Sequence, residues 1–269
     1  MYLAALPKID YCHIGFRLAS PRPDRIHPPP ATRTVLLALT HFEFRGASEY
    51  LEDLVSRIGA PQLNGIYISC LNQLVDFRVA QLPMFINHAG GPKLNPFRYA
   101  RVTFYSDPVT FRTYLHATDS PPDPCYIITY VLCEWIDWQF SHIARVISNF
   151  SATLSNVVHL KLEVHLAEDR QLEGTVDIER LCLLHQFPTV QTLHVSHELE
   201  GHVALALEDI DSEGVAQALP SLDLIYLSDQ QTSSIEKFIT AREPSGRSVT
   251  VVETPTEFEK KNIRVLRHQ

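Results

Sequence analysis

Residues 183–199 of the 269-residue chain read LLHQFPTVQTLHVSHEL. A proline at position 188 precedes the phrase VQTLHV (190–195), which has the form LxxLxL. Apolar and polar residues alternate at its end, with the two-residue period of a strand that buries one face. The same form recurs at residues 39–44, 63–68, 157–162 and 222–227, with weaker copies at 102–104 and 249–251. The phrase therefore predicts a series of short strands along the chain.

Between these strands the apolar residues recur at helical spacing. Ser48 is a favourable N-cap and precedes Leu51 and Val55. Further helices are expected at residues 138–147, 177–184 and 233–239. Strands that alternate with helices predict an α/β fold, because right-handed crossovers place the helices on one side of a parallel sheet. We expect an irregular leucine-rich-repeat-like solenoid, a horseshoe with the parallel sheet on its concave side and the helices on its convex side.

Residues 1–269 are expected to form a single domain of this kind, with two departures from the repeat. Residues 20–33, SPRPDRIHPPPATR, predict a proline-rich surface loop. Three strand-like segments within about residues 100–135 predict an inserted hairpin or an extra strand. The chain also starts within what looks like the end of a repeat, and repeat arrays need a cap at each end. We therefore expect a domain truncated at its N-terminal end.

Composition and charge exclude several classes of protein. The net charge of -8 does not fit a broad basic surface for nucleic acid. Five cysteines without a CxxC pair predict free thiols in a reducing compartment, because zinc ribbons and redox motifs need that spacing. The N-terminal segment does not have the pattern of a secretory signal, and no apolar run reaches the length of a membrane span. We expect a cytoplasmic or nuclear protein.

Four stretches of the chain resemble the leucine-rich-repeat region of F-box-like proteins of mushroom-forming (basidiomycete) fungi. They are TRTVLLALTHFEFRGASEYLEDLVSRIGAPQLNGIYIS (32–69), WQFSHIARVISNFSATLSNVVHLKLE (138–163), LLHQFPTVQTLHVSHEL (183–199) and ALPSLDLIYLSDQQTSSIEKFITAREPSGRSVTV (218–251). The resemblance implies a horseshoe whose repeats hold a substrate while an F-box docks onto a ubiquitin ligase. No F-box-like helical segment precedes the first repeat in this sequence. Contact with a ubiquitin ligase is therefore expected only if an F-box lies upstream.

No motif in the chain predicts catalysis, a cofactor or a metal. The densest histidine cluster, His194, His197 and His202, is a near miss for HExxH, whose histidines stand four residues apart on one helical face. Here the last two are five apart, and Gly201 is expected to interrupt the segment. Residues 209–214 imitate the start of an EF-hand loop, but Pro220 occupies the position that requires a bidentate glutamate. Nucleophile elbows and phosphate-binding glycine loops are absent from the sequence.

Strand geometry predicts a binding face. In each LxL the outer residues point into the core, and the residue between them points to the concave surface. This rule selects Glu43, Tyr67, Thr103, Lys161, His194, Tyr226 and Thr250. Residues two positions earlier share that face: His41, Gly65, Arg101, His159 and Thr192. The side chains of neighbouring strands should form rows, with Lys161, His194 and Tyr226 contiguous if the last repeats stack in chain order.

Our first hypothesis is a non-catalytic repeat domain that binds a protein partner, and the resemblance implies the substrate-recognition part of an F-box-type ubiquitin ligase receptor. A second hypothesis is a truncated paralogue with a structural role or no partner. The third is a hydrolase, because a catalytic triad assembled in space leaves no trace in a sequence.

Overall fold

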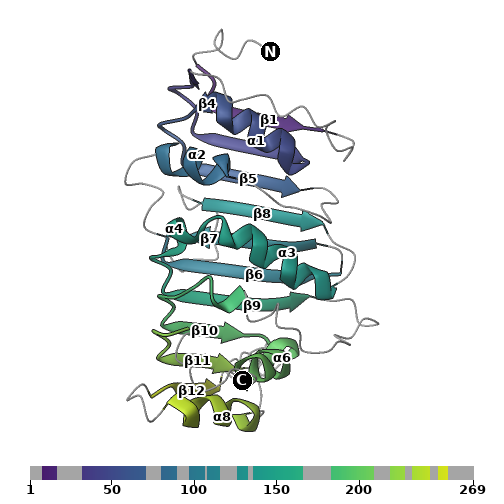
Figure 1. Cartoon of the computed structure of the whole chain (residues 1–269), viewed down its shortest axis with the longest axis vertical. Coiled ribbons are helices and arrows are strands. Elements are labelled where there is room, and N and C mark those ends of the chain that lie inside the picture. Colours follow the sequence, from purple (N-terminus) through teal and green to yellow (C-terminus); the bar gives the residue numbers. More distant parts are fainter. Residues whose placement is uncertain are drawn as a thin grey trace, which may run out of the picture.

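The computed structural model describes residues 8–16, 32–70, 80–89, 97–106, 108–115, 126–132, 136–165, 183–208, 219–227, 232–242 and 248–253. The described strands form one ten-stranded sheet and a small two-stranded sheet (Figure 1). The large sheet contains β1 (Tyr11–Gly15), β3 (His41–Gly46), β5 (Gly65–Cys70), β6 (Tyr99–Tyr105), β7 (Pro108–Tyr114), β8 (Tyr126–Leu132), β9 (His159–His165), β10 (Thr192–Val195), β11 (Leu224–Leu227) and β12 (Thr250–Glu253). The small sheet pairs β2 (Thr34–Val35) with β4 (Ile58–Gly59).

The large sheet confirms the predicted α/β class with a mostly parallel sheet. Each recurring apolar phrase ends in a strand: β3, β5, β9, β10 and β11 lie where the sequence places them. Every described pair of neighbouring strands is parallel except the two pairs that involve β7. The last four strands stack in chain order, as expected.

The middle of the sheet does not follow the order of the chain. From one edge to the other the order is β1-β3-β5-β8-β7-β6-β9-β10-β11-β12. Strands β6, β7 and β8 form an antiparallel meander in the region of the three strand-like segments. The meander enters the sheet in reverse, so β8 pairs with β5 and β6 pairs with β9. Strands that adjoin in the sheet at these two places are therefore far apart in sequence.

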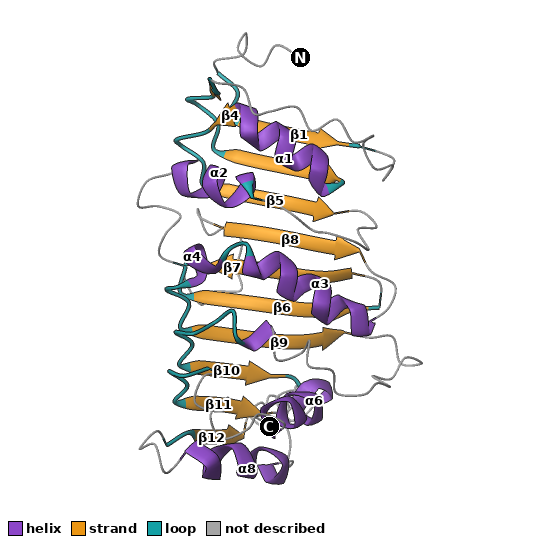
Figure 2. Ribbon diagram, in the orientation of Figure 1, coloured by secondary structure: helices purple, strands orange, loops and turns teal. Residues whose placement is uncertain are grey.

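The helices lie over one face of the sheet (Figure 2). They are α1 (Ser48–Arg57), α2 (Gln81–Ala89), α3 (Ile136–Ser148), α4 (Ser151–Leu154), α6 (His197–Glu208) and α8 (Thr232–Arg242). The helix predicted around Leu51 and Val55 and the segments predicted at 138–147 and 233–239 are confirmed as helices. Most of the segment predicted at 177–184, and nearly all of the proline-rich loop 20–33, lie outside the described residues.

Two details of the helix predictions are wrong. Ser48 is the first helical residue and is buried, whereas Ala47 occupies the N-cap position and makes no side-chain cap. Gly201 does not interrupt its segment, because α6 runs through it from His197 to Glu208. The apolar residues of α6 explain the helix: Leu199, Val203 and Leu207 recur every four residues and are buried.

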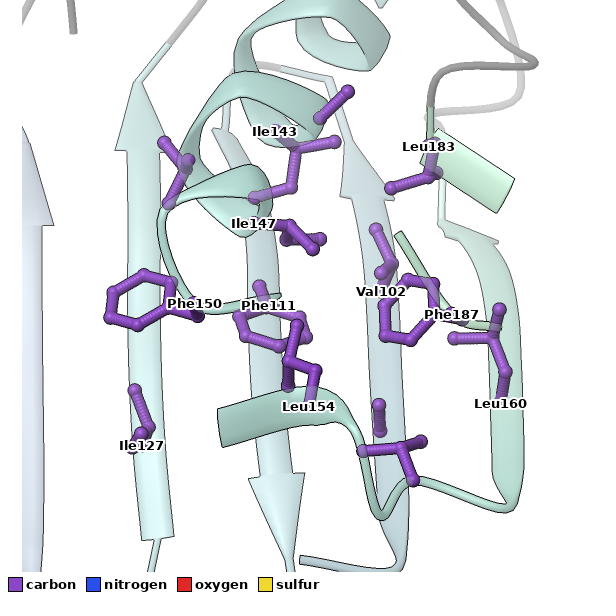
Figure 3. Packing of buried hydrophobic residues seen from close by; sticks show 14 of the residues in the cluster. Val102, Phe111, Ile127, Ile143, Ile147, Phe150, Leu154, Leu160, Leu183 and Phe187 are labelled. Carbon is purple, nitrogen blue, oxygen red and sulfur yellow. The ribbon is translucent and has the colours of Figure 1, made fainter. Parts of the chain in front are cut away.

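The core lies between the helices and the sheet (Figure 3). Ile143 and Ile147 of α3 point toward Phe111 of β7 in this layer, and all three are fully buried. The ring of Phe111 also lies 6.4 Å from that of Phe187, in the turn before β10. The inserted meander is thus packed into the same core as the recurring strands.

Candidate binding surface on the polar face of the sheet

The face of the large sheet turned away from the helices is called the polar face here. Burial alternates along each strand: in β9, Leu160 and Leu162 are buried, while Lys161 and Glu163 between and after them remain partly exposed. This alternation follows from the two-residue period of a strand. It places polar and aromatic side chains from all ten strands on one surface.

One row of side chains crosses the whole polar face. The pairing register connects, from β1 to β12, His13, Glu43, Tyr67, Ile128, Arg112, Arg101, Lys161, His194, Tyr226 and Val252. We call this set the central row. Neighbouring members stand on strands about 4.8 Å apart, so their side chains lie within reach of one another.

Five of the seven residues selected from the sequence as a binding face lie in the central row: Glu43, Tyr67, Lys161, His194 and Tyr226. Thr103 does not. It lies on the polar face, but its register partners are Thr110 and Glu163, and only 3% of its surface is exposed. Arg101, two residues earlier, takes the place beside Lys161. The face of this strand was predicted correctly. Its alignment with the neighbouring strand was wrong by two residues.

The last strand carries the same error. Thr250 pairs with Leu224 and not with Tyr226, whose partner is Val252. The predicted neighbouring row is formed in part, because His41 pairs with Gly65 and Thr192 pairs with His159.

An ion cluster lies where β6 meets β9. The carboxylate of Glu163 is 2.5 Å from the ammonium nitrogen of Lys161 and 3.6 Å from Nε of Arg101. The Lys161 side chain keeps 42% of its surface exposed, whereas that of Glu163 keeps 16%. One carboxylate is therefore shared by two cations, one of which reaches solvent.

Arg112 of β7 is held by tyrosines. Its guanidinium donates a hydrogen bond to the hydroxyl of Tyr130 at 3.0 Å and lies 5.9 Å from the centre of that ring. The ring of Tyr130 is 5.1 Å from that of Tyr67. Burial raises the pKa of Tyr67, and the neighbouring Tyr130 and Glu43 raise it further. Arg101 lies in the same way over Tyr114, at 5.9 Å. Both arginines are thus held against aromatic rings, an arrangement that favours a planar cation.

Two stacked pairs of rings flank Lys161. His194 lies parallel to Tyr226 at 4.2 Å, and His159 lies nearly parallel to Tyr99 at 4.5 Å. Burial, together with the charges of Lys161 and His159 and against an opposing effect of Glu163, lowers the pKa of His194 to about 4. Burial, followed by the charge of Arg98, also lowers the pKa of His159. Near neutral pH the rings of these two histidines therefore add flat, uncharged surface and no charge.

The other end of the row carries a single carboxylate. The hydroxyl of Tyr11 donates a hydrogen bond to the carboxylate of Glu43, and Nδ1 of His13 lies 3.8 Å from the same carboxylate. The central row therefore changes along its length, from the Glu43 carboxylate on β3 to cations at β7, β6 and β9.

Sequence reasoning missed Arg112, Tyr114 and Tyr130 as members of this surface. The signal was present: in β7, Phe111 and Thr113 are buried while Arg112 and Tyr114 alternate with them. The sequence analysis predicts an inserted hairpin or an extra strand for this segment, but it does not predict which face of the sheet its side chains take.

The histidine cluster considered for zinc is dispersed. His194 lies on the polar face, His197 begins α6 and lies 3.8 Å from the buried carboxylate of Glu200, and His202 lines a small hollow beside Phe140. Within the described residues no group of histidine, cysteine, aspartate and glutamate is placed to hold a metal ion. The described helices also include none long and apolar enough to cross a membrane.

Comparisons with other proteins give no relative. No protein-family model matches the chain, and neither a curated protein nor a solved structure was found to match it.

Proposed function

We propose that this chain is a non-catalytic protein-binding domain that holds its partner on the polar face of the sheet. The observation that carries the proposal is the central row. It gathers Tyr67, Arg112, Arg101 and Tyr226 on one surface. Tyrosine and arginine are the residues that most often dominate the energy of protein interfaces, because each joins a large contact area to directed hydrogen bonding.

The dimensions of the row suit an extended protein segment. Ten strands at a spacing of about 4.8 Å give a row of about 43 Å. About thirteen residues of extended chain cover that length at about 3.3 Å per residue. The strands are anchored in one apolar core, so the surface is ordered before the partner arrives, and less entropy is lost on binding.

In its finer form the proposal is that the fold is an irregular leucine-rich-repeat-like solenoid with the polar face on the concave side. Its supports are the recurring LxxLxL phrase and the resemblance to F-box-like proteins of mushroom-forming fungi. On this proposal the chain is the substrate-recognition part of a ubiquitin ligase receptor in the cytoplasm or nucleus. Contact with the ligase is proposed only if an F-box lies upstream of the repeats.

Selection from a random library of linear peptides tests the proposal. The immobilised wild-type chain first selects peptides from the library. The affinity of each retained peptide is then measured for the wild type and for the variant Lys161→Ala/His194→Ala/Tyr226→Ala. The matched control is Glu49→Ala/Met84→Ala/Arg145→Ala, which removes exposed side chains from three helices. We expect peptides that bind the wild type and the control alike and lose at least about tenfold in affinity for the polar-face variant.

Melting curves establish first that both variants fold. A library that yields no binder contradicts the proposal. So does a set of binders that the polar-face variant retains at full affinity, because the partner would then be held elsewhere on the molecule.

A further inference from the structure

Three cations stand side by side in the central row. Arg112 of β7 pairs with Arg101 of β6, and Arg101 pairs with Lys161 of β9. We call these three residues the cationic strip. Its charge is opposite to that of the whole chain, which has 31 acidic against 23 basic residues and a net charge of -8. The reversed antiparallel meander creates the strip, because it places β6 next to β9 and β7 on the other side of β6.

One member of the strip has no carboxylate partner among the described residues. Glu163 lies between Arg101 and Lys161 and forms ion pairs with both. The described contacts of the Arg112 guanidinium are to tyrosines, and its buried Nε has no hydrogen-bond acceptor among the described residues. Among the described residues, the positive charge of Arg112 is therefore not paired with a carboxylate.

The surroundings strengthen this charge. Tyrosine rings lie against both arginines at 5.9 Å and exclude water from one side of each guanidinium. Charge pairs are stronger in such partly dry surroundings than in open solvent. The two flanking histidines are neutral near pH 7, because burial holds the pKa of each below its ordinary value. They offer their rings as flat contact area and do not repel an anion or a cation.

We propose that the partner of the polar face is an acidic protein segment whose carboxylates pair with Arg112, Arg101 and Lys161. This inference rests on the proposed function and gives the chemistry of the partner. Charge complementarity supports it: planar guanidinium groups bind carboxylates through paired N–H donors, and Lys161 reaches solvent beside them.

The acidic stretch of the partner lies over β7, β6 and β9, where the three cations stand together. Glu43 lies four strands away from Arg101, about 19 Å across the sheet, and Arg45 lies on the same face of β3, so β3 has no comparable excess of charge.

The test uses two labelled peptides of equal length in fluorescence anisotropy. In one, glutamate alternates with serine; in the other, glutamine replaces every glutamate. We expect the glutamate peptide to bind the wild type at least about tenfold more tightly than the glutamine peptide. We expect this preference to shrink as salt rises from about 0.05 M to about 0.3 M, because the Debye length falls below the separation of exposed charges. The salt series needs no variant, so it stands whether or not the variants fold.

The variant Arg101→Gln/Arg112→Gln should weaken the glutamate peptide by about tenfold or more, while Arg45→Gln should change it by less than about twofold. Arg45 is the matched control, since it is an exposed arginine on the same face at the end of β3. Arg112→Lys is added because it keeps the charge and loses the planar fork. It should retain a clear preference for the glutamate peptide.

Several outcomes overturn the inference. The first is equal affinity for the two peptides, and the second is a double variant that binds as the wild type does. The third is a concentration-dependent dimer that the double variant abolishes, because the face would then belong to a second copy of the chain. If the random library yields polar-face binders that are neutral or basic, the inference fails while the proposed function stands. If neither the library nor the glutamate peptide binds, both fail.

Discussion

Acid should destabilise the folded chain through His194. In the folded state burial, with the charges of Lys161 and His159, lowers the pKa of this ring to about 4 from its ordinary value of 6.5. As the pH falls below 6.5, the unfolded chain takes up a proton that the folded chain still refuses. The equilibrium therefore moves toward unfolding, and stability present above pH 6.5 is lost as the pH falls toward 4.

The size of the effect follows from the two pKa values. Between about pH 7.5 and about pH 5 the linkage relation gives a loss of about 2 kcal/mol for a ring that keeps its full shift. The ring of His194 is only partly buried, so solvent screens the neighbouring charges. We halve the figure for this reason and expect a loss of about 1 kcal/mol.

Urea unfolding at several pH values measures the loss. Other groups titrate over the same range, so the quantity of interest is the difference in unfolding free energy between the wild type and His194→Phe, which keeps a flat ring against Tyr226. This difference should fall by about 1 kcal/mol from about pH 7.5 to about pH 5. His165→Phe, at an exposed position at the end of β9, is the matched control. A difference that stays constant over this range would refute the reasoning.

Three further predictions concern the core. Phe111→Ala should cost about 3–5 kcal/mol in thermal or urea unfolding, because the ring is fully buried between α3 and Phe187, and a destabilisation below about 1 kcal/mol would contradict the packing. Arg242→Met should cost about 2–3 kcal/mol, because the buried guanidinium donates to the backbone carbonyl oxygen of Leu219 at 2.9 Å and to that of the next residue. Arg242→Lys should restore little of this, since it lacks the fork; full recovery would show that the charge alone matters. In a variant that keeps only Cys70, the thiol should not react with a disulfide reagent near pH 8 until the chain unfolds, because burial raises its pKa to about 12, and rapid reaction of the folded chain would disagree.

For the recurring LxxLxL phrases, the sequence predicted both the strands and the face that each side chain takes. In a strand with one buried face, apolar and polar residues alternate with a period of two. Lys161, His194 and Tyr226 were therefore assigned to the polar face correctly. A shift of two residues along a strand leaves that alternation unchanged. The face of Thr103 was therefore predictable, but its place in a row was not. The row depends on the register of hydrogen bonds to neighbouring strands.

The order of the strands in the sheet could not be predicted from the alternation of apolar and polar residues either. The apolar alternation of β6, β7 and β8 is satisfied equally well by a meander inserted in either direction. The choice is made by packing between distant segments, such as Phe111 against Phe187. Helix α6 is different, because Leu199, Val203 and Leu207 have helical spacing that the sequence contained. This helix was not predicted, because Gly201 was expected to interrupt the segment.

Hydroxyl-radical footprinting with and without a bound library peptide tests the central claim, that the polar face holds the partner. Tyrosine and methionine side chains both react with the radical, and the chain offers both. Tyr226 and Tyr67 lie in the central row, whereas Met84 of α2 is 39% exposed and lies on a helix. The account predicts that the peptide protects the two tyrosines and leaves the oxidation of Met84 unchanged. Protection of Met84 with unchanged oxidation of Tyr226 and Tyr67 would place the partner on the helices and contradict the account.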